Sequence, residues 1–317
     1  GKAGIVSTLY AVYKVNNKTA YGEFLDYYFS LDANTNRYLR PLVRKGAKND
    51  MKINNEYVLH DRIFAPSIAE QKRITYFFSV LDNKINELKE KKALLEEYKK
   101  GMMQKIFSQE IRFKDNDGKE FPKWQETTLG QIGKTFNGLS GKTKEDFGEG
   151  LPYIQYKQIF GSSLIDISEC DFVKILSNEK QNKVKFGDVF FTTSSETPLE
   201  IGFSSVLLSN VEEIYLNSFC FGYRINSANI LSPFFAQYLF RSQKFRKEVI
   251  KLGQGSTRYN MSKNELMKTI IFLPTEKEQL KIANFLTKVD EKIKNVGEQI
   301  EETKAYKKGL LQKMFCV

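Results

Sequence analysis

The chain has 317 residues, a size typical of two domains, and its 41% hydrophobic content excludes a disordered protein. Its net charge of +11 favours a polyanionic partner, with an anionic membrane surface as the competing interpretation. No apolar run approaches the roughly 20 residues of a membrane span, and no signal-peptide pattern opens the sequence. Three widely spaced cysteines are typical of reduced thiols, so we expect a cytoplasmic protein without a membrane partner.

Residues 1–65 have the pattern of the last part of a domain. The spacing predicts a strand over 5–15, a helix over 22–29, and a short strand over 62–64. A basic stretch lies between them, from Arg37 to Lys52. Because the sequence begins at Gly1 in the middle of this pattern, we expect a fragment whose first domain lacks its beginning.

A repeated segment follows, and it organises the rest of the chain. Residues 66–109 and 274–317 align without gaps, and both begin Pro-x-x-x-Glu-Gln-x-x-Ile. Ser67 and Thr275 are placed to N-cap a helix, with Glu70 and Glu278 at the capping-box position. Each copy is therefore predicted to be a helix of about 40 residues, roughly 60 Å long. Matches upstream of both helices, such as Asn55-Glu56 with Asn264-Glu265, indicate that the repeat extends into the preceding domains.

Each predicted helix has one apolar stripe at helical spacing, flanked by Lys and Glu of mixed sign. Two such helices of equal length can bury their stripes on each other, whereas two unrelated surface helices are the alternative. The residues predicted to pair the helices are Ile74, Phe78, Leu81, Ile85 and Leu88 in the first copy, and Ile282, Phe285, Val289, Ile293 and Val296 in the second.

Residues 110–273 form the one segment with the size of a complete domain. Its pattern predicts strands over 153–154, 171–175, 188–192, 204–208 and 219–225. A helix from Pro233 to about Leu252, N-capped by Ser232, is followed by a polar loop at 253–258. Strands before and between helices predict an α+β fold with a β-rich core.

The sequence offers little for catalysis. Gly-Lys-Thr occurs twice, but the first glycine of a P-loop falls on Phe136 and Thr128, so neither copy fits the motif. His60 is the one histidine, and a structural role is favoured over a catalytic one. No cysteine cluster has zinc-ligand spacing, and no glycine-rich loop suits S-adenosylmethionine. We therefore expect a non-catalytic chain without metal or cofactor.

Positive charge is concentrated at corresponding places in the two repeats, over 37–52 and 224–268. Such patches bind phosphates through counterion release, although an ordinary solvated helix face is the alternative. Amides, hydroxyls and arginines on loops beside a patch can read bases, although a plain loop role is equally compatible with each residue. The predicted DNA contacts are Arg44, Lys45, Lys48, Lys142, Gln155, Tyr156, Lys157, Thr192, Thr193, Ser194, Ser195, Arg246, Lys251, Gln254, Ser256, Thr257 and Arg258.

Two domains, each ending in a helix that starts Pro-x-x-x-Glu-Gln-x-x-Ile, resemble the specificity subunit of type I restriction-modification enzymes. Phe121-Pro-Lys-Trp124 and the segment 185–192 are similar to parts of that family's target recognition domains. The resemblance covers essentially the whole chain. It divides the chain into the end of a truncated first recognition domain (1–65), a spacer helix (66–109), a complete second recognition domain (110–273) and a second spacer helix (274–317).

The resemblance implies that each recognition domain reads one half of a split site in double-stranded DNA. The two helices would pair antiparallel as a coiled-coil spacer that sets the gap, and would dock methyltransferase subunits, through which restriction and translocase subunits join. S-adenosylmethionine, ATP and magnesium would belong to those partners. Since 65 residues are too few for a whole first domain, either one half-site is not read or a second copy or another fragment supplies that domain. The rival interpretation is a helical scaffold with an incidental basic patch.

Overall fold

The computed structural model describes residues 11–45, 51–53, 55–60 and 62–315, and it divides into two units. Unit 1 comprises Gly1–Leu95 with Lys292–Val317, and unit 2 comprises Glu96–Glu291. The two long helices, α4 (Ile68–Phe107) and α10 (Glu276–Phe315), each contribute one part to unit 1 and the other part to unit 2. Each unit is described by itself below.

Unit 1 surrounds the beginning of α4 and the end of α10 with small elements. They are α1 (Gly22–Phe29), α2 (Asp32–Leu39), η1 (Arg40–Leu42), the antiparallel strands β1 (Val43–Lys45) and β2 (Met51–Ile53), and α3 (Asn55–Val58). Phe24 of α1, Phe78 of α4 and Phe315 of α10 are buried together in its core. This core forms because α1 presents its aromatic face where both long helices expose their apolar stripes.

Unit 2 contains the β-rich domain. Its strands are β3 (Gln125–Thr128), β4 (Gly133–Asn137), β5 (Phe147–Ile154), β6 (Asp171–Val173), β7 (Val189–Thr192), β8 (Ser194–Ser195), β9 (Ser204–Val206), β10 (Tyr215–Leu216), β11 (Cys220–Ile225), β12 (Gly253–Gln254), β13 (Tyr259–Met261) and β14 (Ile270–Leu273). Its shorter helices are α5 (Leu129–Ile132), η2 (Lys144–Asp146), α6 (Tyr156–Gly161), η3 (Ile167–Glu169), η4 (Pro198–Glu200), α7 (Pro233–Leu239), α8 (Gln243–Ile250) and α9 (Lys263–Met267).

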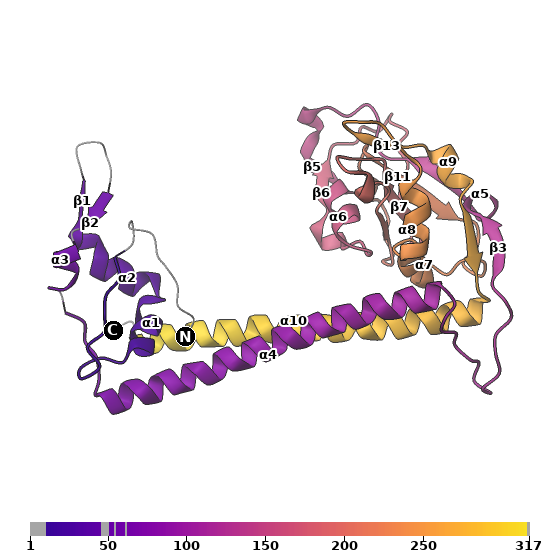
Figure 1. Cartoon of the computed structure of the whole chain (residues 1–317). Helices are drawn as coiled ribbons and strands as arrows, with labels where there is room; N and C mark the ends of the chain where they lie inside the picture. The colour runs from indigo at the N-terminus through magenta and orange to yellow at the C-terminus, as the bar shows by residue number, and fades with distance from the viewer. Residues whose placement is uncertain (1–10, 46–50, 54, 61, 316–317) are drawn as a thin grey trace. The chain divides into compact units, whose positions relative to one another are not determined.

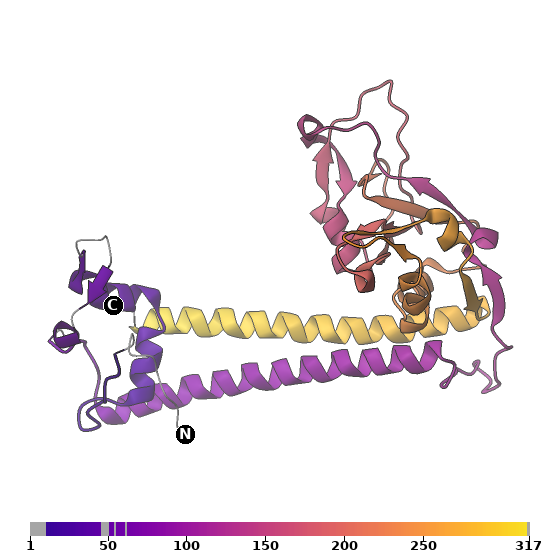
Figure 2. The same cartoon turned by 45° about the horizontal axis from the view of Figure 1, so that its top comes forward.

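The sheets of unit 2 are small and mostly antiparallel. The central sheet has the order β4-β11-β7-β9, and a second sheet, β10-β5-β6, includes the parallel pair β10–β5. A three-stranded sheet, β12-β13-β8, and the pair β14–β3 complete the domain. Helices α7 and α8 cover the central sheet, and the main core buries Phe191, Phe221 and Phe240 between them (Figures 1 and 2). Strand β7 is buried along its whole length because both of its faces are covered.

Segments of α4 and α10 lie against each other in both units. In unit 1, Leu88 and Leu95 of α4 pack with Val296 and Ile300 of α10. In unit 2, Tyr98 of α4 contacts the ring of Phe285 at 6.5 Å between centroids. Since rising numbers on α4 meet falling numbers on α10, the helices run antiparallel. The α+β fold with two long antiparallel helices, expected from the sequence, is confirmed.

The stripe residues have different neighbours along the helices. Ile74, Phe78 and Leu81 join the aromatic core of unit 1 with α1, whereas Ile282 and Phe285 pack with the core of unit 2. Leu88 and Val296 contact the opposite helix. The others, Ile85, Val289 and Ile293, are buried or half-buried along the helices. Each stripe therefore serves two purposes, because its first turns anchor a globular part and its later turns meet the partner helix.

The sequence repeat is also a repeat of contacts. The Gln71 side chain accepts from the backbone N–H of Tyr21 at 2.8 Å and donates to the Pro66 carbonyl at 2.8 Å. The Gln279 side chain accepts from Ser232 at 2.8 Å and donates to Pro274 at 3.0 Å. Both glutamines are at most 1% exposed. Each therefore fastens the start of a long helix to the segment that enters the preceding helix, α1 or α7.

A second repeated contact joins a tyrosine, an aspartate and a lysine. Tyr27 donates to Asp82 at 2.6 Å, and Lys307 forms an ion pair with the same carboxylate. In unit 2, Tyr238 donates to Asp290 at 2.9 Å, and Lys99 pairs with it at 2.5 Å. Burial raises the pKa of both tyrosines, so each hydroxyl remains a proton donor at neutral pH.

Replacing Gln279 with leucine should lower the free energy of unfolding of unit 2 by about 2–4 kcal/mol. The change leaves the Ser232 N–H and the Ile230 and Pro274 carbonyls without this partner in a buried place, at about 1–3 kcal/mol for each orphaned group that cannot reach water. Urea denaturation followed through the fluorescence of Trp124 measures the effect. Gln299→Leu on the exposed face of α10 is the matched control, and an equal loss in both variants would contradict this role of Gln279.

Several predicted elements differ from the structure. The strand predicted over 5–15 lies partly outside the described residues, and residues 11–15 form no strand. The strand predicted over 62–64 is also wrong, because these residues pair with no strand in the described part of the chain. The single helix predicted to reach Leu252 is two helices, because Ser242 N-caps α8 by accepting from the N–H of Phe245. The helix predicted over 22–29 is confirmed as α1.

Candidate nucleic-acid interface

Three of the loop segments selected from the sequence come together in unit 2. Strand β13 pairs on one side with β8, through Tyr259 and Ser195, and on the other side with β12, through Asn260 and Gln254. The hydroxyl of Tyr156, the first residue of α6, donates to the Ser194 carbonyl at 2.8 Å. Residues 155–157, 192–195 and 254–258 therefore form one cluster, although they are distant in the sequence.

The hairpin between β12 and β13 presents the most accessible polar groups of this cluster. Gln254, Ser256, Thr257 and Arg258 are all exposed. Gly255 has a φ of +128°, and a Cβ added there would lie 2.2 Å from the Arg258 carbonyl oxygen. The turn therefore requires glycine, and it brings amide, hydroxyl and guanidinium donors together at one tip. These are the groups that read base edges and phosphates.

The side chains of segment 192–195 mostly hold neighbouring segments together, and little of their surface is accessible. Thr192 is fully buried, and Ser194 and Ser195 are each 6% exposed. The Ser195 hydroxyl donates to Glu200 at 3.2 Å, and the hydroxyl of Thr193, which is half-buried, donates to the Phe219 carbonyl at 2.7 Å. Their predicted base contacts have no support from this geometry, because the side chains are covered or hold neighbouring segments.

At the start of α6, one side chain holds the cluster together and others remain accessible. The Tyr156 hydroxyl donates to the Ser194 carbonyl, so this side chain holds the cluster together. Burial raises the pKa of Tyr156, which keeps the hydroxyl a proton donor. Gln155 is half-buried, and Lys157 is exposed. The accessible surface that remains for DNA consists of Gln155, Lys157 and the hairpin tip.

Two arginines, the half-buried Arg241 and the buried Arg246, hold the segments of the cluster in place. Arg241 donates to the Ile159, Phe160 and Ser162 carbonyls at the end of α6. Arg246, which is 8% exposed, donates to the Leu199 carbonyl at 2.9 Å. Desolvation lowers the pKa of both guanidinium groups to about 10, so both remain charged at neutral pH. A phosphate contact by Arg246, as predicted from the sequence, would require this side chain to leave its carbonyl partners.

Both guanidinium groups also face one aromatic ring. The carbon centres of Arg241 and Arg246 lie 4.7 Å and 4.4 Å from the centroid of Phe203. Cation–π contact and carbonyl hydrogen bonds together compensate the desolvation of the two charges. A count of charges along the sequence does not reveal this positioning role, because such a count carries no information on burial.

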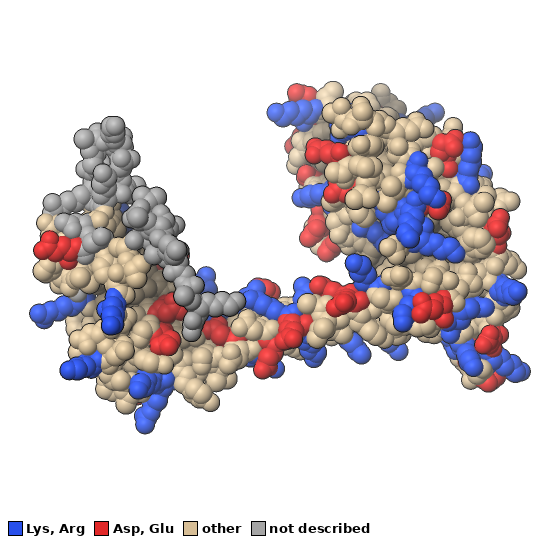
Figure 3. Space-filling model, in the orientation of Figure 1, with Lys and Arg blue, Asp and Glu red and all other residues tan. Residues whose placement is uncertain are grey.

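Most of the basic stretch 224–268 is paired inside the domain. Arg224 donates to both oxygens of Asp188, at 2.8 Å and 2.7 Å, and Lys251 and Lys268 pair with Glu248 and Glu265. Lys263 bonds the Asn137 side chain. Figure 3 nevertheless shows Lys and Arg side chains gathered on the globular part of unit 2. Helix α8 and its C-cap carry the exposed Lys244, Lys247 and Lys251. The phosphate-binding surface is therefore smaller than the sequence count indicates.

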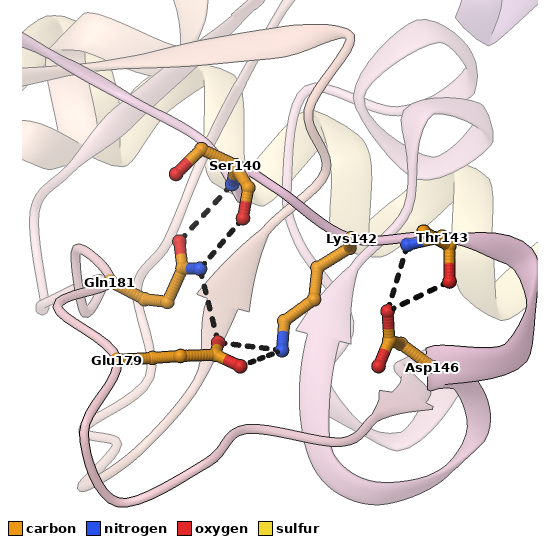
Figure 4. Close-up of polar contacts among 6 residues, drawn as sticks. All are labelled: Ser140, Lys142, Thr143, Asp146, Glu179 and Gln181. Carbon is orange, nitrogen blue, oxygen red and sulfur yellow. Dashed lines mark hydrogen bonds and ion pairs between the residues drawn. The ribbon is translucent and has the colours of Figure 1, made fainter.

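The side chain of Lys142, a predicted DNA contact, is buried and paired instead of exposed. Its ammonium group pairs with Glu179 at 2.6 Å, and the lysine side chain is 4% exposed. Gln181 both donates to and accepts from the backbone of Ser140, and the Thr143 N–H donates to Asp146, as Figure 4 shows. The Lys142 bond holds the pKa of Glu179 below its usual range. This loop is fixed by its own contacts, so its geometry offers no support for a phosphate contact by Lys142.

The predicted contacts in residues 1–65 are only partly described. Arg44 and Lys45 lie in β1, but their side chains are not described, and Lys48 lies outside the described residues. His60, for which a structural role was expected, is exposed in a turn after α3. Within the described residues, no cluster of His, Cys, Asp and Glu could hold a metal ion, and no helix is long and apolar enough to cross a membrane.

Asn260 belongs to the candidate interface although it was not selected from the sequence. It is exposed on β13, opposite Gln254 on β12, so its side-chain amide extends the polar surface of the hairpin. The alternation Tyr259-Asn260-Met261, with Met261 buried, could have revealed it.

Comparison with known proteins decides the family. The family model described as the type I restriction modification DNA specificity domain matches residues 122–305, more than half of the chain. The chain belongs to this family. The match of this specificity chain begins just before β3 and extends into α10, so it includes the entire hairpin cluster.

Curated relatives of the specificity chain occur in Methanocaldococcus jannaschii. A putative type I restriction enzyme MjaX specificity subunit is 27% identical over 276 residues, which are 83% of this chain and 61% of the relative. The type I restriction enzyme MjaVIII specificity subunit is 26% identical over 255 residues, 77% of this chain and 59% of the relative. The specificity chain thus spans about three-fifths of the length of these relatives.

Solved structures share the fold of the specificity chain. The HsdS subunit from Thermoanaerobacter tengcongensis has a TM-score of 0.50 at 21% identity, covering 95% of this chain and 70% of its own. The type I restriction-modification S subunit from M. genitalium has a TM-score of 0.55 at 16% identity, covering 92% and 72%. A chain from a study of complex assembly and conformational transition of the type I R-M system has a TM-score of 0.58 at 20% identity, covering 95% and 73%.

Proposed function

We propose that this specificity chain is a non-catalytic DNA-recognition subunit of a type I restriction-modification complex, and that unit 2 reads one half of a bipartite site. The observation that carries the proposal is the exposed hairpin tip, with Gln254, Ser256, Thr257 and Arg258, inside the segment that matches the specificity-domain family. Arginine and amide side chains can contact base edges with two hydrogen bonds each, so this tip suits direct readout in the major groove.

The partners follow from the same proposal. Methyltransferase subunits would dock on α4 and α10, and restriction and translocase subunits would join through them. S-adenosylmethionine, ATP and magnesium would then be bound by those partners. The family match and the names of the curated relatives support this assignment. The exposed polar faces of both long helices are compatible with a second layer of helices.

Co-purification with a cognate methyltransferase subunit, followed by selection from a random-sequence DNA pool, tests the proposed function. Enrichment of a short motif is expected. One half-site would mean that unit 2 alone reads sequence, whereas two half-sites at a fixed gap would mean that unit 1 is completed by another polypeptide. A stable complex that selects no motif would reject the proposal in favour of a scaffold.

We further propose that α4 and α10 set the gap between half-sites. Inserting four residues, about one helical turn, at facing positions of both helices should widen the accepted gap by about two base pairs, because it lengthens the spacer by about 6 Å. The same selection measures the gap in a complex that reads two half-sites. The control inserts four residues into the exposed turn 115–118, and an unchanged gap in the helix variant would refute the spacer role.

A further inference from the structure

Unit 2 contains a cavity of about 420 Å³ that takes no part in the hairpin cluster. Its lining residues come from the end of α4, from α7, α8 and α9, and from β14. None of the hairpin residues 254–258 lines it. Sites for small molecules in proteins are concave and measure about 300–1,000 Å³, so this cavity has the size of a ligand site.

The wall of the cavity is formed by aromatic and branched aliphatic side chains. They are Phe107, Trp124, Phe245 and Phe272, with Leu239, Leu252, Ile270 and Ile271. Aromatic rings prefer to pack on other rings in offset or edge-to-face arrangements. A wall with four such rings therefore favours a ligand that itself has a flat aromatic body.

The aromatic wall is held in place by packing inside the domain. The rings of Phe107 and Trp124 lie 6.3 Å apart between centroids, and those of Phe245 and Phe240 lie 4.9 Å apart. Phe107, Trp124 and Phe245 are all buried. Strand β14, which forms another part of the wall, pairs with β3 over four residues. The wall is thus ordered before a ligand arrives, so binding loses little entropy in the protein.

The charged residues that line the cavity do not balance one another. Three of them are lysines and two are glutamates. The two glutamates are used in the ion pairs Lys251–Glu248, at 2.8 Å, and Lys268–Glu265, at 2.7 Å. Lys244 pairs with no carboxylate in the described part of the chain, and its ammonium group lies 4.6 Å from the centroid of the Phe272 ring. One positive charge therefore remains beside the aromatic wall.

We propose that this cavity binds a small aromatic monoanion, such as an aromatic carboxylate, as a free molecule. Its ring system packs on the wall beside Phe107 and Phe245, and its carboxylate pairs with Lys244. The charge-assisted bond to the ammonium group selects for an anion, and the ring contacts provide the apolar part of the affinity. A cationic molecule of the same shape meets Lys244 as a like charge, and a neutral one gains no ion pair.

The probe is 2-naphthoate, a carboxylate on two fused aromatic rings, titrated into the full chain labelled with nitrogen-15. Trp124 is the one tryptophan of the sequence, so its indole N–H gives a single NMR signal from the wall of the cavity. This signal should shift with 2-naphthoate until it saturates. The neutral 2-naphthylmethanol should bind about tenfold more weakly, and the cationic 2-naphthylmethylamine more weakly still.

A variant of the unpaired lysine tests the source of this selectivity. Lys244→Gln should lower the affinity for 2-naphthoate about tenfold and leave the affinity for 2-naphthylmethanol unchanged, because only the anion uses the ammonium group. Lys247→Gln is the matched control. Lys247 is exposed on the same helix and does not line the cavity, so this change should affect neither compound.

Three results would overturn the proposal. The first is an unchanged Trp124 signal up to roughly 1 mM 2-naphthoate. The second is equal affinity for the three compounds, or affinity for 2-naphthoate that Lys244→Gln leaves unchanged, because the charge would then play no part. The third comes from the same titration of the chain bound to its methyltransferase subunit. Binding should persist there, and its loss would assign the cavity to the interface with that subunit.

Discussion

Replacing Arg112 with alanine is expected to lower the free energy of unfolding of unit 2 by about 3–5 kcal/mol, because it leaves a buried carboxylate without its cation. The Arg112 guanidinium donates to Glu278 at 3.2 Å and 2.7 Å, and it also donates to the Pro122 carbonyl at 2.7 Å. Glu278 is 0% exposed. The lost bond to Pro122 also loosens the segment that delivers Trp124 to the core.

Urea denaturation followed through Trp124 measures this loss in the full chain. Arg73→Ala is the matched control, because Arg73 pairs with the equivalent Glu70 on an exposed surface, where such pairs contribute about 0–1 kcal/mol. Adding Glu278→Gln to Arg112→Ala should recover part of the stability, since it removes the uncompensated charge. A loss below about 1 kcal/mol for Arg112→Ala would show that Glu278 finds another partner.

Replacing Arg258 with alanine is expected to weaken binding of the selected DNA by about 10–100-fold, the value of a base contact worth about 1–3 kcal/mol. Arg258 is exposed at the tip of the β12–β13 hairpin, so its loss leaves no buried group without a partner. The fold should therefore remain intact, and the sequence preference should relax at one position. If Arg258 contacts phosphate instead, affinity falls uniformly and the salt dependence of binding becomes less steep.

Binding isotherms at several salt concentrations separate these two roles. Lys123→Ala, an exposed lysine of unit 2 outside the hairpin cluster, is the matched control and should retain full affinity. Urea denaturation of both variants verifies the fold. Equal affinity of Arg258→Ala and the unaltered chain for every sequence would exclude the hairpin from recognition.

The division of the chain into domains and long helices was predictable because the same helix pattern occurs twice in the sequence. Helical spacing from Ile74 and from Ile282 fixes two long amphipathic helices, since apolar residues at that period have one structural solution. The structure explains why each Pro-x-x-x-Glu-Gln motif contains a glutamine. The Gln71 and Gln279 side chains fasten each long helix to its domain. The glutamate, by contrast, is buried in one copy and exposed in the other, because Arg112 covers Glu278.

The candidate interface was predictable only in its loops. Residues 155–157 and 254–258 were selected by composition, and the structure brings them together through β8 and β13. The roles of the cations were not predictable, because the sequence does not distinguish a buried arginine or lysine from an exposed one. Arg246 donates to a backbone carbonyl, and Lys142 pairs with a carboxylate. Pairing across the sheet depends on strand order, which a charge count along the chain cannot supply.

Selection from a random DNA pool with and without the hairpin side chains tests whether the β12–β13 hairpin reads DNA bases. The chain is bound to its methyltransferase subunit, and the variant carries alanine at Gln254, Ser256, Thr257 and Arg258. The unaltered complex should enrich a motif, and the variant should lose part of that motif while it stays assembled. An identical motif from both complexes would contradict recognition by the hairpin, because base recognition would then reside outside it.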